Sequence, residues 1–280
     1  MKAGIYFKKG VGVARDLSIK IAEMISSRGW DVFFDSEFAG EIDMSRFKIS
    51  DLRDLDLDFI VVVGGDGTLI KLLHKLGERS IPIMTVRMGR RGVLLDVSPI
   101  EVESRLEDLF NGRYVIRSYE RIYAEIEDRS IRTPPAINEI LVTPSVEYIR
   151  SRVLRCTVYK DDTLIYSLEG DGVIVSTSIG STAYSLAAGG PLVDHSLPVM
   201  VITPLLPINL WVRPVVLPID SIVRIMVRKD SIPAEIVIDG SVKIPIAPGE
   251  SVKISRYPHP VRIIRFHRDE SIYEKIFERR

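Results

Sequence analysis

Residues 59–68 read Phe-Ile-Val-Val-Val-Gly-Gly-Asp-Gly-Thr, and this stretch decides the fold. Its apolar half is typical of a strand buried on both faces, as in a parallel sheet. Residues 69–76 then place apolar side chains at helical spacing. The glycines between them allow a sharp turn and a close approach of the backbone to a ligand. We therefore expect a strand, a glycine turn and a helix in direct succession.

The turn itself predicts a phosphate site that contains one acid. Free backbone N–H groups of a turn and of a helix start bind phosphate. Asp66 can accept a hydroxyl proton or contact Mg²⁺ through a water, and both roles suit phosphoryl transfer. A Walker A loop is excluded because no Gly-Lys-Ser/Thr follows, and the nicotinamide fingerprint Gly-x-Gly-x-x-Gly is absent. The alternative is an ordinary turn in which Asp66 or Thr68 caps the helix.

Strand and helix patterns alternate through the first third of the chain, which predicts a parallel sheet. The expected elements are strands at 3–7, 30–34, 60–63 and 81–86, and helices at 12–28 and 98–110. Ser98 and Pro99 supply the cap and first turn of the second helix.

From residue 114 onward the pattern changes to period-two runs separated by turns, and prolines between 203 and 218 exclude helix there. A last strand at 261–266 and a short charged helix at 270–279 follow. We expect a Rossmann-like α/β domain, residues 1–113 plus 257–280, onto which the terminal helix packs back. Residues 114–256 are expected to form a β-rich, β-sandwich-like domain.

Composition limits the partners of the protein. The formal net charge of +0 gives no electrostatic argument for nucleic acid or membrane binding, and neither partner is expected. No segment approaches the ~20 apolar residues of a spanning helix, and the first residues do not resemble a signal peptide, so a cytoplasmic protein is expected. Cys156 alternates with apolar residues and is expected to be a packed strand thiol, and the four histidines lack zinc-ligand spacing.

A second glycine-rich block, residues 169–191, is dominated by small and hydroxyl side chains. It predicts a strand at 173–175, a loop with exposed donors at 176–181 and a short helix at 182–188. We interpret the block as a pocket for a polar ligand, with Tyr184 offering a ring for stacking on a base. The alternative is a purely structural turn.

Asn138 and Glu139 precede another strand between these two blocks. Such a pair is usually solvated or capping. Adjacent amide and carboxylate groups are also what recognition of ribose hydroxyls requires.

Together these motifs resemble the NAD kinase family over nearly the whole chain. The resemblance rests on Gly-Gly-Asp-Gly-Thr at 64–68, Asn138-Glu139, Gly-Asp-Gly at 170–172, Gly-Ser-Thr-Ala-Tyr at 180–184, Gly-Gly-Pro at 189–191 and the late Asp239-Gly240. It implies NAD bound between two domains, homodimers or homotetramers, and Mg²⁺ or another divalent ion. The implied reaction transfers the γ-phosphate of ATP, or phosphate from polyphosphate, to the adenosine-ribose 2′-hydroxyl of NAD, giving NADP.

The resemblance also implies roles for single residues. Asp66 would be the catalytic base or an indirect metal partner beside the 2′-hydroxyl. Donor phosphates would contact Gly64, Gly65, Gly67 and Thr68. NAD would contact Asp66, Gly67, Asn138, Glu139, Asp171, Ser178, Thr182, Ala183, Tyr184 and Asp239.

Three segments depart from the family pattern. Arg87-Met-Gly-Arg-Arg-Gly-Val-Leu94 replaces Asn-x-Gly-x-Leu-Gly-Phe-Leu, and its Arg90 and Arg91 either bind phosphate or form a solvated basic loop. Residues 207–210 lack the usual histidine, and Ser241 replaces a glutamine. Two rival functions stay open: a kinase of the same fold acting on another hydroxyl, and a nucleotide sensor without turnover.

Overall fold

The computed structural model describes residues 1–89, 94–148 and 152–266. These residues form two compact units, one of Met1–Ser118 with the strand β19 (Val261–Arg265) and one of Tyr119–Pro260. The first is α/β and the second is almost entirely β, so the expected fold class is confirmed. The helix expected at 270–279 lies outside the described residues.

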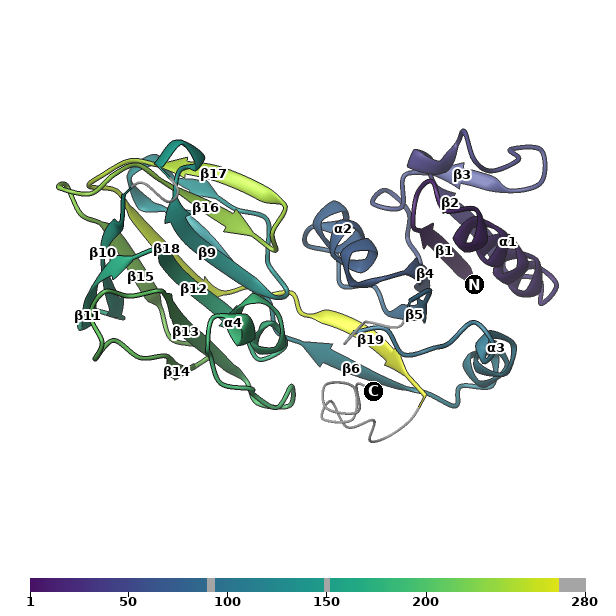
Figure 1. Cartoon of the computed structure of the whole chain (residues 1–280). Coiled ribbons are helices and arrows are strands. Elements are labelled where there is room, and N and C mark those ends of the chain that lie inside the picture. Colours follow the sequence, from purple (N-terminus) through teal and green to yellow (C-terminus); the bar gives the residue numbers. More distant parts are fainter. Residues whose placement is uncertain (90–93, 149–151, 267–280) are drawn as a thin grey trace. The chain divides into compact units, whose positions relative to one another are not determined.

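The first unit is built on a seven-stranded sheet in the order β3-β2-β1-β4-β5-β19-β6 (Figure 1). Its other strands are β1 (Lys2–Phe7), β2 (Asp31–Asp35), β3 (Lys48–Ser50), β4 (Phe59–Gly64), β5 (Ile83–Arg87) and β6 (Val115–Tyr119). The pairs from β3 through β19 are parallel, and every residue of β4 is buried. Both features fit a Rossmann-like sheet covered on its two faces.

The helices of this unit are α1 (Gly12–Ser26), α2 (Asp66–Leu76), α3 (Val102–Phe110) and the 3₁₀ helix η1 (Ser36–Phe38). The expectation that a helix opens at Ser98 is wrong, because residues 98–101 form a separate turn. In it the Glu101 N–H donates to the Ser98 carbonyl at 3.0 Å, and the Ser98 hydroxyl donates to the Glu101 carboxylate. Helical geometry therefore starts only at Val102.

The second unit consists of two six-stranded antiparallel sheets. One has the order β11-β10-β15-β18-β7-β8, comprising β7 (Ile122–Ile126), β8 (Ile131–Arg132), β10 (Leu154–Lys160), β11 (Thr163–Gly170), β15 (Val223–Val227) and β18 (Ser251–Arg256). The other has the order β14-β13-β12-β9-β16-β17, comprising β9 (Glu139–Pro144), β12 (Gly172–Thr177), β13 (Val199–Leu205), β14 (Val215–Pro218), β16 (Ala234–Ile238) and β17 (Val242–Ile246). The described residues of this unit also form four short helices: η2 (Glu127–Arg129), η3 (Val146–Tyr148), η4 (Gly180–Thr182) and α4 (Tyr184–Ala187).

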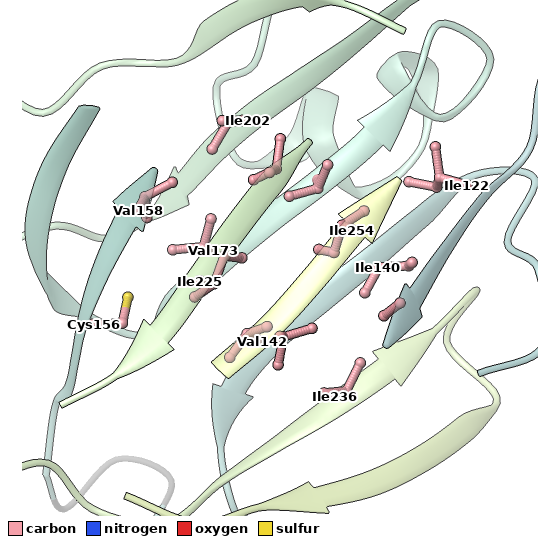
Figure 2. Close-up of a cluster of buried hydrophobic side chains, with 14 of the residues drawn as sticks. Ile122, Ile140, Val142, Cys156, Val158, Val173, Ile202, Ile225, Ile236 and Ile254 are labelled. Atoms are coloured by element: carbon pink, nitrogen blue, oxygen red, sulfur yellow. The ribbon is translucent and has the colours of Figure 1, made fainter. Parts of the chain in front are cut away.

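The core of the second unit is a single cluster of aliphatic side chains contributed by both sheets (Figure 2). Ile140 and Val142 of β9 and Val173 of β12 belong to it, together with the buried Cys156 of β10. Burial raises the pKa of the Cys156 thiol to about 12, and the expected packed thiol is confirmed. Side chains alternate along a strand, so the residues between these core positions face the opposite side of their sheet.

None of the helices in the described parts of the chain combines the length and apolar character needed to cross a bilayer.

Candidate functional site

The glycine turn of the first unit has the expected form, with β4 ending at Gly64 and α2 beginning at Asp66. The Thr68 N–H donates to the Gly65 carbonyl at 2.8 Å, and the Thr68 hydroxyl accepts the Gly65 N–H at 3.4 Å. A Cβ at position 64 would lie 2.4 Å from the Thr68 Oγ1, whereas one at position 65 or 67 would meet nothing within 4 Å. Gly64 is therefore required by packing, and the other two glycines border open space.

The Asp66 side chain is hydrogen-bonded to the backbone of Leu94. Its Oδ1 accepts the Leu94 N–H at 3.3 Å, and the Leu94 carbonyl accepts Nη1 of Arg265 at 3.1 Å. Arg265 lies on β19, is only 8% exposed and also forms an ion pair with Asp96. This support could not be predicted from the sequence, because 171 residues separate Leu94 from Arg265.

A cavity of about 310 Å³ adjoins the turn. It is lined by Tyr6, Phe7, Lys8, Lys9, Glu37, Gly65, Gly67, Thr68 and Lys71. Three lysines and the turn glycines make it suitable for an anionic ligand. Lys8, Lys9 and Lys71 were missed by sequence reasoning, although the two adjacent lysines at the end of an apolar strand were a usable signal. Arg90 and Arg91, expected to bind phosphate, lie outside the described residues.

Asn138 and Glu139 of the second unit are held by the carboxylate of Asp239. Its Oδ1 accepts the N–H groups of Asn138 at 2.8 Å and Glu139 at 3.1 Å, and its Oδ2 accepts that of Ile137 at 3.0 Å. In return, the Asp239 N–H donates to the Glu139 carbonyl at 3.0 Å. Asp239 directly follows the last residue of β16, and its side chain therefore contacts the backbone of the Asn138–Glu139 turn.

The Gly180 to Tyr184 block packs directly on the same turn. A Cβ at position 180 would lie 1.9 Å from the carbonyl oxygen of Asn138, so only glycine fits. Thr177 bonds both neighbouring carbonyls: its N–H donates to Asn138 at 2.9 Å and its hydroxyl to Ile137 at 2.6 Å. Two motifs about 40 residues apart in sequence are thereby brought together.

The Glu139 side chain is buried beneath this block. It is 8% exposed, the backbone N–H of Tyr184 donates to it, and its Oε2 has no hydrogen-bond partner among the described residues. Burial and, secondarily, the negative charge of Asp239 raise the pKa of Glu139 to about 8. A buried polar atom without a partner costs about 1–3 kcal/mol, which indicates a place prepared for a ligand.

Ser176 pairs with Glu139 across β12 and β9, is fully buried, and its hydroxyl also has no hydrogen-bond partner in the described part of the chain. Because Val173 and Val175 face the core, Ser176 faces the same side as Glu139. Sequence reasoning missed Ser176. The alternation along this strand was the signal that could have found it.

The expectation of a loop rich in exposed donors at 176–181 is wrong. Ser176, Thr177, Ser178 and Ser181 are each at most 5% exposed. The Ser181 hydroxyl donates to the Ser178 carbonyl at 2.7 Å and accepts the Val193 N–H at 3.1 Å. The Thr177 and Ser181 hydroxyls satisfy backbone groups of a tightly folded segment, and all four side chains are shielded from solvent.

The remaining expected residues divide into two groups. Thr182 and Ala183 are partly exposed beside the Asn138 turn, and Tyr184 is 47% exposed. Asp171 is exposed at the start of β12, five residues from Ser176, a separation of about 16 Å along a strand. The structure therefore does not bring Asp171 together with Glu139.

A divalent metal would find few ligands on the protein itself. The described residues contain no group of three His, Cys, Asp or Glu side chains placed to hold an ion. Asp66 is the carboxylate of the glycine turn, so an ion there would take most of its oxygen ligands from a bound phosphate.

Known proteins match both units. The family model for the ATP-NAD kinase N-terminal domain matches residues 5–114, and that for the ATP-NAD kinase C-terminal domain matches residues 137–266. An NAD kinase of Aeropyrum pernix is 37% identical over 281 residues, covering 99% of this chain and 96% of the relative. An NAD kinase structure from Archaeoglobus fulgidus in complex with ATP has a TM-score of 0.76 at 25% identity, covering 100% of this chain and 97% of that one. The yeast NADH kinase complexed with NADH shares the fold, with a TM-score of 0.87 at 21% identity and coverage of 100% and 86%.

Proposed function

The chain belongs to the ATP-NAD kinase family, and from that premise we propose how its residues carry out the reaction. It is an NAD kinase that uses ATP as co-substrate, which confirms the enzyme class indicated by the sequence. The proposals below concern which residues hold each substrate, the metal, and a second donor.

The adenosine ribose of NAD is assigned to Asn138 and Glu139. The observation that carries this assignment is the buried Glu139 oxygen without a partner, next to the equally unpartnered Ser176 hydroxyl. An ionised carboxylate accepts hydrogen bonds and ribose hydroxyls donate them, so ligand binding would supply the missing bonds. We assign Thr182, Ala183 and Tyr184 to the bases, Ser178 to the same pocket, and Asp171 to the nicotinamide end.

The phosphates of the donor are assigned to the cavity beside the glycine turn. The support is its volume of about 310 Å³, its three lysines, and the open space around Gly65 and Gly67. This volume is at the lower end of the range usual for ligand pockets. Polyphosphate is a candidate second donor, because a lysine-lined cavity that binds phosphate groups does not by itself require an adenine.

Asp66 is proposed as the base of the transfer. The 2′-oxygen of the ribose forms a bond to the γ-phosphorus, the bond from that phosphorus to the β–γ bridging oxygen breaks, and ADP leaves. The proton of the 2′-hydroxyl passes to the Asp66 carboxylate. Mg²⁺ or another divalent ion, carried mainly by donor phosphate oxygens near Asp66, would neutralise charge on the transferred group.

The assembly and location of the enzyme are proposed as homodimers or homotetramers in the cytoplasm. The single, buried cysteine is in keeping with a reducing compartment. Light scattering on the purified protein tests the assembly.

The experiment that tests these assignments incubates purified protein with a divalent ion, ATP or polyphosphate as donor, and NAD or NADH as acceptor. We expect NADP from Mg-ATP and NAD, and its loss when the metal is chelated. Tight NAD binding without product from any donor would favour a nucleotide sensor.

A further inference from the structure

Asp239 is in an uncommon backbone conformation. Its φ of 44° lies in the left-handed region, which residues other than glycine rarely adopt, although aspartate is among those that tolerate it. The conformation places both carboxylate oxygens against three consecutive backbone N–H groups, those of residues 137, 138 and 139. Hydrogen bonds to an ionised acceptor are stronger than neutral ones. The Asn138–Glu139 turn is therefore fixed by a side chain 100 residues later in the chain.

Both carboxylate oxygens are committed to these backbone groups. The strands β16 and β9 are neighbours in the same sheet. Ile238, the residue before Asp239, pairs with Ile140, the residue after Glu139. A side chain used in this way is suited to orienting its neighbours. It is less suited to a direct ligand contact, the role that the family resemblance suggested for Asp239.

The charge of Asp239 also acts on Glu139. The groups acting on Glu139 in the described part of this unit are the Asp239 carboxylate and the backbone N–H of Tyr184. The first raises the pKa of Glu139, in addition to the larger effect of burial, and the second lowers it. The guanidinium of Arg121, 1% exposed, interacts electrostatically with Asp239 and lies 4.9 Å from the centre of the Tyr257 ring.

We propose that Asp239 is a positioning residue for the ribose subsite: its carboxylate fixes the backbone of Asn138 and Glu139, and its negative charge acts on the Glu139 side chain. The inference rests on the proposed binding of ribose by Asn138 and Glu139. In this account NAD binding strengthens as Glu139 ionises with rising pH. Burial has the larger effect on the midpoint of that rise, and the charge of Asp239 moves the midpoint further toward alkaline pH.

The test uses the full-length variant Asp239→Asn. Asparagine tolerates the left-handed backbone and retains one acceptor oxygen, but it loses the negative charge. The matched control is Asp161→Asn, which makes the same change at a φ of 54° in the β10–β11 hairpin, where the carboxylate accepts the Ile222 N–H at 3.0 Å. The KM for NAD and kcat are measured across the pH range, and NAD binding is measured by calorimetry.

Asp239→Asn is expected to raise the KM for NAD about tenfold, as for the loss of a charge-assisted hydrogen bond, while kcat changes much less. The midpoint of the pH dependence of KM is expected to move about one unit toward acid, because a charge that opposes ionisation of Glu139 is gone. Asp161→Asn should leave both quantities unchanged. A midpoint that stays in place in Asp239→Asn would overturn the proposal, whatever happens to KM.

Two further variants separate the possible failures. Asp239→Gly suits the positive φ and removes all acceptors, so it serves if the asparagine variant does not fold; wild-type kinetics in it would overturn the proposal. Glu139→Gln should raise the KM for NAD and abolish the pH midpoint. If Glu139→Gln leaves KM unchanged, the ribose assignment itself fails. If it acts as expected while Asp239→Asn does not move the midpoint, only the role of Asp239 fails.

Discussion

Asp66 and Glu139 are both carboxylates of the proposed substrate sites, yet their surroundings differ. Asp66 is partly exposed at the start of a helix, in a turn made of consecutive residues. Glu139 is buried, and its turn is completed by Gly180 and Asp239 from elsewhere in the chain. The difference teaches that the turn carrying the proposed base is formed by consecutive residues, with distant support only through Leu94 and Arg265, whereas the turn of the proposed ribose site is itself assembled from distant parts of the β unit.

Replacing Asp66 gives the largest effect expected from this comparison. Asp66→Asn should lower kcat by a factor of about 10³, because a base acts mainly in the transition state, and should leave NAD affinity within about tenfold. Steady-state NADP formation and calorimetry measure the two quantities. Asp56→Asn, at a fully exposed carboxylate, is the control. Equal loss of turnover and affinity would make Asp66 a binding residue.

The same difference explains how far the sequence could be interpreted. The Gly-Gly-Asp-Gly-Thr turn was predictable because all its parts are contiguous. The strand before it needed only an apolar run, and the helix after it only apolar residues at helical spacing. The supports Arg265 and Asp239 were not predictable in these roles, since each contacts a backbone segment 100 or more residues away. The hydroxyl groups of residues 176–181 were wrongly expected to be exposed. The amino-acid composition of a segment does not show whether its hydroxyls bond water or the backbone.

Gly180→Ala tests whether the ribose turn depends on close packing between distant segments. The new Cβ would lie 1.9 Å from a backbone oxygen of Asn138, and a backbone atom cannot rotate away. We expect about 3 kcal/mol of lost stability in denaturant unfolding, and weaker NAD binding. Gly40→Ala is the control, because nothing lies within 4 Å of its Cβ.

Gly64→Ala makes the equivalent change in the local turn. Its Cβ would meet only the Thr68 side chain, so the cost should be smaller and the double variant with Thr68→Ala should recover part of it. Equal, unrecovered losses at positions 64 and 180 would contradict the distinction between a local and an assembled turn.

The buried state of Glu139 predicts a pH dependence of stability. The pKa of Glu139 is raised from 4.5 to about 8, so the folded protein retains a proton that the unfolded chain has already released. Stability should therefore fall as pH rises from about 4.5 to about 8, by about 5 kcal/mol in total, and level off above that. Glu139→Gln should remove this fall, measured as the free energy of unfolding across pH. The exposed Glu78→Gln should retain it. A wild-type pH profile in Glu139→Gln would show that Glu139 ionises normally.

The smallest effect is expected at the donor cavity, where the charges are exposed and screened by solvent. Lys71→Gln should raise the KM for ATP about fivefold and leave the KM for NAD unchanged, because one of three lysines around the cavity is lost. Lys20→Gln, at an exposed lysine paired with Glu103, is the control. Repeating the assay at higher salt should shrink the difference between Lys71→Gln and wild type, as for any exposed charge. A change of similar size in the KM for NAD would show that Lys71 contributes to NAD binding. The proposed separation between a donor site at the local glycine turn and a ribose site assembled from distant segments would then be wrong.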